Sequence, residues 1–233
     1  MKLEAVSVQR LYLQIAEQLV QLIHTGDIQP GERLPSERDL ASRFDVSRPT
    51  IREAMIALEV SNMVEVRSGS GVYVLPQAKE GRLEAMEDLP GPYEILEARA
   101  LIEGEAAALA AERMSNEDVQ ELGQLLKQLI AEIDSGDIEA AEKIDQLFHI
   151  KIARGSRNSA MLSTVNWLWK MRNESEIATV FHRHAREEGS TPSQEEHQNI
   201  LDAITRRDAA AARDAMIIHL ERVVLNFNDY TPE

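Results

Sequence analysis

Six histidines and no cysteines decide which metal chemistry is open to this chain of 233 residues. Without thiolates, a bound ion must rely on imidazole and carboxylate ligands. Asp145 and His149 are four residues apart, so on a helix they lie on one face and could share an ion. His197 and His219 occur in later stretches with helical apolar spacing. Three imidazoles and one carboxylate suit zinc, nickel, cobalt or manganese and leave positions open for a small oxygen ligand.

Each of these histidines taken alone is more simply explained as a hydrogen-bonded helix residue. The triplet HRH holds His182 and His184, which a helix would splay apart. We interpret this pair as a surface or pocket-rim feature. Asn158 is interpreted as a helix cap, because asparagine is a preferred residue at that position.

Two arginines add a possible anion site. Arg99 lies in GPYEILEARALIEGEAA and Arg172 in WLWKMRNES, both in stretches with helical spacing. A guanidinium inside a helical bundle needs an anion, because burying an unpaired charge is costly. A carboxylate ligand would satisfy it, and so would an internal salt bridge to Glu103 or Glu105.

Nothing beside these residues indicates catalysis. A metal-dependent hydrolase would explain the metal ligands, but the chain lacks H-E-x-x-H spacing and a clear general base next to them. We therefore expect a binding protein and not an enzyme, with the hydrolase as the alternative.

The composition indicates two domains that hold these residues. Residues 1–75 carry a net charge of −2, and residues 76–233 carry −13. Pro76, Pro90, Gly91 and Pro92 flank a weakly patterned stretch, so 76–92 is predicted to be a linker between a first domain, 1–75, and a helical domain, 93–228. Helices in the second domain are predicted near 93–113, 116–134, 137–154, 158–180, 193–205 and 208–227.

The first domain has the pattern of three helices followed by a hairpin. The first helix is predicted to bury one apolar stripe, and the second begins at Ser36 with Leu40 and Phe44 facing inward. MVEVRSGSGVYVL (63–75) alternates apolar and polar residues around a glycine-rich turn, which predicts a two-stranded wing. The stripe of the first helix comprises Leu11, Ile15, Leu19, Leu22 and Ile23.

The third helix begins at Ser47 and gathers Arg48, Thr50 and Arg52 near its N-terminus. Arginines can bind guanine edges, and hydroxyls can bind phosphates. A short helix, a tight turn and such a third helix have the layout of a helix-turn-helix. A solvated helix face is the alternative interpretation.

Residues 30–74 resemble the winged helix-turn-helix of the GntR family of bacterial transcription regulators over that whole length. The resemblance implies that side chains of the helix-turn-helix and residues of the wing contact DNA. Relatives often carry histidine or lysine in the wing, where this chain has Ser68 and Ser70. The implied contact residues are Arg38, Ser47, Arg48, Thr50, Arg52 and Gly69.

The second half resembles the all-helical FCD effector domain of the FadR subfamily, which carries Asp-x-x-x-His followed by two histidines on later helices. Asp145, His149, His197 and His219 match in order, which implies a bound divalent ion, with zinc favoured. GPYEILEARALIE, WLWKMRNES, HRH and HQNILDAITRRDAAAARDAMIIHLERV are similar to repressors of hexuronate catabolism of the ExuR and UxuR type. That similarity implies a sugar-acid effector, with Arg99 and Arg172 as its binding residues.

The expected partners follow from this interpretation. Helix-turn-helix proteins normally bind pseudo-palindromic operators as two-fold dimers, so we expect operator DNA and a homodimer. No apolar run reaches the ~18 residues that span a bilayer, and MKLEAVSVQR has no signal-peptide core, so we expect no membrane partner and a cytoplasmic protein. A regulator that senses another organic acid remains an alternative.

Overall fold

The computed structural model describes residues 10–67, 69–76, 78, 83, 90–187, 189 and 191–228. The chain divides into two compact units between Gly91 and Pro92. Most of the predicted linker, 76–92, and the wing residue Ser68 lie outside the described residues.

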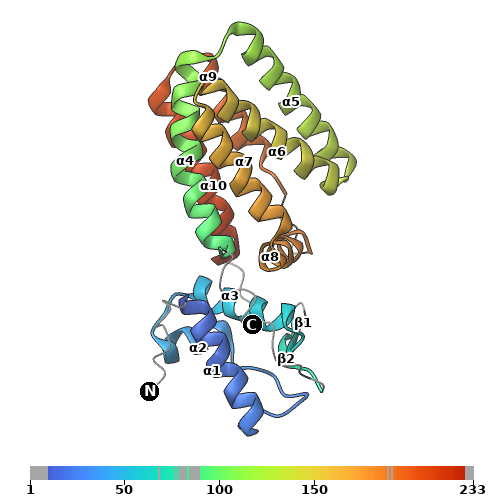
Figure 1. Cartoon of the computed structure of the whole chain (residues 1–233). Helices are drawn as coiled ribbons and strands as arrows, with labels where there is room; N and C mark the ends of the chain where they lie inside the picture. The colour runs from blue at the N-terminus through green and yellow to red at the C-terminus, as the bar shows by residue number, and fades with distance from the viewer. Residues whose placement is uncertain are drawn as a thin grey trace, which may run out of the picture. The chain divides into compact units, whose positions relative to one another are not determined.

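The first unit is a winged helix-turn-helix, as expected. Its elements are α1 (Leu11–Thr25), α2 (Glu37–Phe44), α3 (Arg48–Val60), β1 (Val64–Arg67) and β2 (Gly71–Val74), and the two strands pair antiparallel (Figure 1). Ser36 and Ser47 cap the second and third helices by accepting from the backbone N–H groups of Asp39 and Thr50, at 3.2 and 3.3 Å. The turn between α2 and α3 begins at Asp45, which ends α2 with a left-handed backbone (φ 54°), and it ends at the Ser47 cap.

The buried face of α1 differs from the predicted stripe. Ile15, Leu19 and Ile23 are buried, but Leu11 is 51% exposed and Leu22 is 38% exposed. On a helical wheel these two leucines lie at the margin of the face, whose centre is filled by neighbours at helical spacing. Phe44 is half-buried and does not join the core. The residues that complete the face against α3 are Tyr12, Leu13 and Ala16.

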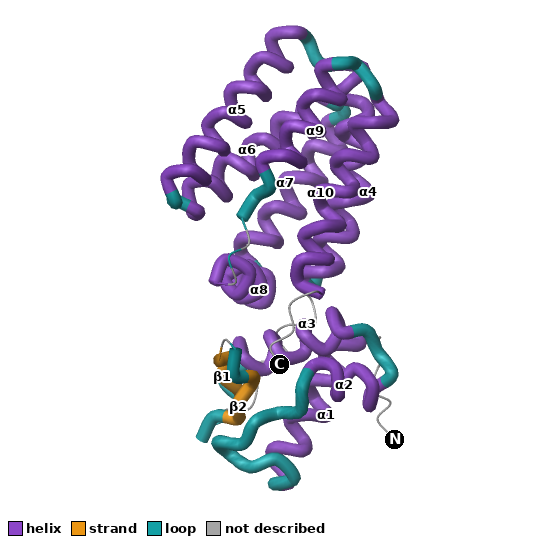
Figure 2. The backbone as a smooth tube through the Cα atoms, turned by 180° about the vertical axis from the view of Figure 1, so that it is seen from behind, coloured by secondary structure: helices purple, strands orange, loops and turns teal. Residues whose placement is uncertain are grey.

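The second unit is an all-α bundle, as expected (Figure 2). Seven helices are described where six were predicted. None of the described helices is long and apolar enough to cross a membrane. The helices are α4 (Pro92–Arg113), α5 (Asn116–Ser135), α6 (Ile138–Gly155), α7 (Ser159–Glu174), α8 (Glu176–Glu187), α9 (Gln194–Thr205) and α10 (Ala209–Asn228).

The single helix predicted over 158–180 is in fact two helices. Ser175 has extended backbone (φ −69°, ψ 126°), and its N–H donates to the carbonyl of Met171. Its Oγ then accepts from the N–H of Ala178, 3.5 Å away, in the first turn of the next helix. Both views show α8 nearly end-on beside the lengthwise α7 (Figures 1 and 2). The break therefore points α8 across the bundle.

Helix α4 packs against α6, α7 and α9 in the centre of this unit. Small residues allow the close approach: four alanines of α4 have no exposed surface, and Gly104 leaves room for Ile217 of α10. This packing holds the backbones of the helices that carry the predicted metal ligands. The alanines are Ala106, Ala107, Ala110 and Ala111.

Candidate metal centre

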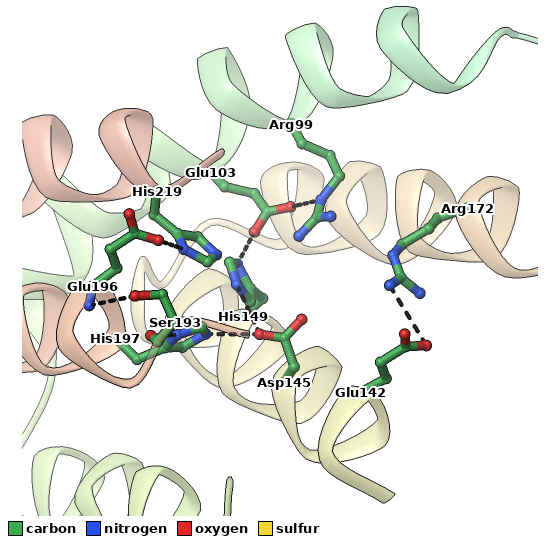
Figure 3. A network of polar contacts seen from close by, with 10 residues as sticks. All are labelled: Arg99, Glu103, Glu142, Asp145, His149, Arg172, Ser193, Glu196, His197 and His219. Carbon is green, nitrogen blue, oxygen red and sulfur yellow. Dashed lines mark hydrogen bonds and ion pairs between the residues drawn. The ribbon is translucent and has the colours of Figure 1, made fainter. Parts of the chain in front are cut away.

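The four predicted metal ligands come together inside the second unit. Asp145 and His149 lie on α6, His197 on α9 and His219 on α10. One ligand atom from each residue lies within 4.8 Å of the others, and all four side chains are buried. Figure 3 shows the three rings and the carboxylate turned toward one another. The predicted constellation is therefore assembled from α6 and from the two consecutive helices α9 and α10.

Each histidine ring turns its Nδ1 away from the cluster, toward a hydrogen-bond acceptor. Because an acceptor faces Nδ1, that atom carries the proton, and in the neutral ring Nε2 keeps its lone pair for an ion. Such outer acceptors fix the ring orientation of metal-binding histidines. The contacts are His149 Nδ1 to Glu103 Oε2 at 2.5 Å, His197 Nδ1 to the carbonyl of Ser193 at 2.7 Å, and His219 Nδ1 to Glu196 Oε2 at 3.0 Å.

On the inner side, one ring nitrogen lacks a partner. Nε2 of His149 is buried and makes no hydrogen bond to any described residue, although Oδ1 of Asp145 lies 3.7 Å away. Nε2 of His197 lies 2.7 Å from the same oxygen. A buried imidazole nitrogen without a partner, beside a carboxylate and two further rings, is what a bound cation would satisfy. The residues present therefore fit a divalent ion.

The charge states of Asp145 and His219 suit a cation. Burial alone would raise the pKa of Asp145, but the hydrogen bond from His197 and the nearby imidazoles hold it well below its usual range. Burial lowers the pKa of His219 to about 4, so this ring stays neutral near pH 7. Asp145 is thus an anion and His219 a neutral donor, the forms that bind metal. Burial lowers the pKa of His197, but its hydrogen bond to Asp145 outweighs this and raises the pKa, so that ring must give up a proton when an ion binds.

Arg99 is linked to the cluster through Glu103. Its Nε donates to Oε1 of that carboxylate at 2.6 Å, and the other oxygen accepts from His149. Burial would raise the pKa of Glu103, but Arg99 and His149 lower it to about 2. The Arg99 guanidinium also stacks 3.9 Å over the ring of Trp169. The salt bridge to Glu103 considered from the sequence is thus present, whereas Glu105 pairs with Arg213 instead.

A pocket opens beside the cluster and is lined by Asp145 and His219. Arg99, Arg172 and Arg186 also line it, so three guanidinium groups face the same space as two cluster residues. Burial lowers the pKa of Arg172, and the charge of Arg99 adds to that effect. Guanidinium groups in a partly desolvated pocket attract an anion. The pocket therefore suits a small carboxylate next to the cluster.

Several residues of this site were missed in the sequence. Glu142 precedes Asp145 by three positions on the same face of α6, a signal that was available. Arg186 lies on α8, beyond the end of the helix that the sequence predicted over 158–180. His182, predicted to be a rim residue, is buried and lines the pocket, where burial and the nearby arginines keep its pKa well below its usual value. Asn158 caps α7, accepting from two backbone N–H groups, as predicted.

The residues expected to contact DNA lie in the helix-turn-helix and the wing. Arg52 makes a two-pronged contact with Glu37 of α2 at 2.9 and 2.7 Å, and Arg48 lies 3.8 Å from the same carboxylate. Ser47 caps α3, and its Oγ lies 2.7 Å from Oγ1 of Thr50. Arg38 on α2 is exposed. Gly69 is also exposed and has a φ of +69° in the wing turn.

Comparison with known families covers both units. Residues 11–74 match the family of bacterial regulatory proteins called gntR, and residues 94–222 match the FCD domain. The chain belongs to the GntR family. Its FCD domain places it in the FadR subfamily, whose members are transcription regulators and not enzymes. The helix-turn-helix of this family binds operator DNA, and the FCD domain binds an effector.

Individual relatives extend over nearly the whole chain. The Uxu operon transcriptional regulator of Escherichia coli (strain K12) is 35% identical over 226 residues, covering 94% of this chain and 87% of that protein. The Exu regulon transcriptional regulator of the same strain is 34% identical over 232 residues, covering 97% and 88%. A solved GntR-family regulator from Pseudomonas syringae pv. tomato shares the fold, with 23% identity and a TM-score of 0.51 over 94% of this chain and 86% of that one.

Proposed function

We propose that this GntR-family regulator represses genes of sugar-acid (hexuronate) catabolism and leaves its operator when a hexuronate-type acid binds in the FCD domain. The observation that carries the proposal is the pocket in which three arginines face the same space as Asp145 and His219. The similarity to the Uxu and Exu regulators supports the class of effector.

Asp145, His149, His197 and His219 would hold the metal, for which we favour zinc over nickel, cobalt and manganese. When bound, the ion would supply a positive centre for the effector's carboxylate and an adjacent oxygen. Around it, Glu103, Ser193 and Glu196 keep the three rings turned inward through their Nδ1 atoms. The metal then holds the ligand in place and takes no part in a reaction.

Arg99 and Arg172 are proposed to bind the effector. The Nε edge of Arg99 is occupied by Glu103, while its Nη atoms make no hydrogen bond to a described residue and can donate to a ligand. Arg172 lies across the Trp169 ring, 5.1 Å from its centre, and donates to Asn173 at 2.9 Å. Both guanidinium groups are therefore held in place before a ligand arrives, which lowers the entropy cost of binding.

The pocket-lining residues come from α4, α6, α7, α8 and α10 and from residues 191–193 before α9. A ligand that contacts several helices at once favours one arrangement of them over another. We infer that the change in helix arrangement alters how the two DNA-binding domains of a dimer contact a pseudo-palindromic operator. A tenfold loss of operator affinity needs only about 1.4 kcal/mol of differential binding.

A thermal-shift panel tests the effector class and the metal together. Glucuronate, galacturonate, fructuronate and tagaturonate are each added to the zinc-loaded protein, with and without a chelator, and glucose and lactate are the controls. We expect at least one uronate to raise the melting temperature, with the gain lost after chelation, because a ligand of the folded state stabilises it. Equal stabilisation by glucose, or no effect of any uronate, would overturn the proposal. A larger shift with lactate would favour a regulator of another organic acid.

A further inference from the structure

Glu142 gives the pocket a second end, whose chemistry differs from that of the metal centre. It lies on α6 three residues before Asp145, so the two carboxylates project from the same helix face. Both residues line the pocket, and Figure 3 shows them next to each other on that helix. Positions three apart on a helix are separated by roughly 5–6 Å between Cβ atoms, the span of a short polyol chain.

Two arginines hold the carboxylate of Glu142 in place. Nη1 of Arg186 donates to both of its oxygens, at 3.1 and 3.0 Å, and Nη2 of Arg172 lies 3.8 Å from Oε2. The Glu142 side chain is 18% exposed. An ionised carboxylate offers about four lone-pair sites, so these contacts leave capacity to accept hydrogen bonds from a ligand.

This arrangement distinguishes ligands by the chemical groups at the end that lies farthest from the metal centre. Hydroxyl groups can donate to Glu142, as they would to any oriented carboxylate. A second ligand carboxylate would meet a like charge, and the two arginines that could attract it are already shared with Glu142. A short hydroxy acid held at the metal centre does not extend to this end.

We propose that Glu142 is a specificity-determining residue that selects acids whose far end carries hydroxyl groups and no charge. The inference rests on the proposed function, in which the acid end of the effector lies at the metal centre. Glu142 then excludes diacids and favours polyhydroxy monoacids over short hydroxy acids.

Isothermal titration of the zinc-loaded full chain tests this with three probes: galacturonate, the corresponding diacid galactarate, and lactate. In the unaltered protein, galacturonate should bind at least tenfold more tightly than galactarate. Glu142→Gln removes the charge and keeps the shape, so this preference should fall by about tenfold, while lactate affinity changes less than twofold. Because the preference is a ratio within one preparation, an inactive fraction does not alter it.

Glu139→Gln is the matched control. Glu139 also lies on α6, but its side chain is 82% exposed and pairs with Lys143, so this substitution should leave all three affinities unchanged. An unchanged preference in Glu142→Gln, with galacturonate still binding to the unaltered protein, would overturn the inference and leave the proposed function standing. If the unaltered protein binds no sugar acid, the proposed function fails and the inference falls with it.

Discussion

The Nδ1 atoms of three histidines indicate what kind of site the cluster is. Each faces an acceptor outside the cluster, two of them carboxylates, and the Nε2 atoms of His149 and His197 face Asp145. A structural hydrogen-bond network would more simply satisfy both nitrogens, yet Nε2 of His149 has no partner among the described residues. The pattern is the one that metal-binding histidines adopt.

We first expect about one divalent ion per chain in the purified protein. Replacing His149 and His219 together with alanine removes two of the four ligands, so the ion should be lost. Elemental analysis measures this directly, and His24→Ala, an exposed position on α1, serves as the control. A metal-free protein that gains no thermal stability from zinc, nickel or manganese would mean that the four residues are structural.

Glu103→Gln tests the outer support of the cluster. The amide keeps the size of the side chain but removes the charge that Arg99 and His149 share, so metal affinity should fall about 10–100-fold. Competition with a coloured chelator gives the affinity. The control is Glu105→Gln. Glu105 lies two positions further along α4 and its side chain is 54% exposed, so this substitution should leave the metal affinity unchanged. Equal affinities of the two variants would show that Glu103 does not orient the ligand ring.

The two arginines of α3 differ in how closely they contact Glu37 of α2. Arg48→Ala should lower operator affinity by about 1–3 kcal/mol without changing the melting temperature, because it removes a base or phosphate contact. Arg52→Ala should lower both, since its two-pronged contact with Glu37 joins the helices and only 14% of its side chain is exposed. Gel shift at fixed salt and a thermal melt measure these effects, with Lys127→Ala as the charge control. Unchanged operator affinity in both arginine variants would mean that the recognition helix is wrongly assigned.

The sequence predicted the features that depend on local residue spacing, such as helix caps and the Asp145–His149 pair. It did not predict the features that depend on tertiary packing. Asp145 and His149 were recognisable because one helix turn separates them, and the caps Ser36, Ser47 and Asn158 because their residue types favour that position. The break at Ser175 was missed because apolar spacing runs through it without glycine or proline, although a serine followed by Glu176 is itself a helix-start signal.

The outer residues of the site were harder to predict. Glu103 was considered only as a salt-bridge partner of an arginine, because nothing in the sequence shows that α4 brings it to a ring 46 positions away. Leu11 and Leu22 were placed in the core because apolar side chains at the margin of a helix face resemble those at its centre. Tertiary contacts alone distinguish these cases.

For the whole molecule, the charge distribution restricts how the regulator meets DNA. The formal net charge is −15, and nearly all of the excess lies after residue 75. Phosphate therefore repels the effector domain, and affinity must come from a few arginines of the first unit, ideally from two copies at once. We expect sedimentation at a mass twice the 26.2 kDa of one chain, and one dimer per operator. A monomer on DNA at saturating protein would contradict this.

In the proposed mechanism, the bound acid acts through the metal centre to release DNA. The most direct measurement is fluorescence anisotropy of a labelled operator, selected from random DNA with the zinc-loaded protein and titrated with galacturonate, glucuronate, fructuronate or tagaturonate. We predict that at least one of these acids weakens operator binding tenfold or more. Glucose should have no effect, and the acid should lose its effect after chelation and in Arg99→Ala. Release by glucose as readily as by the acids, or release by an acid that is unchanged by chelation and by Arg99→Ala, would contradict the account.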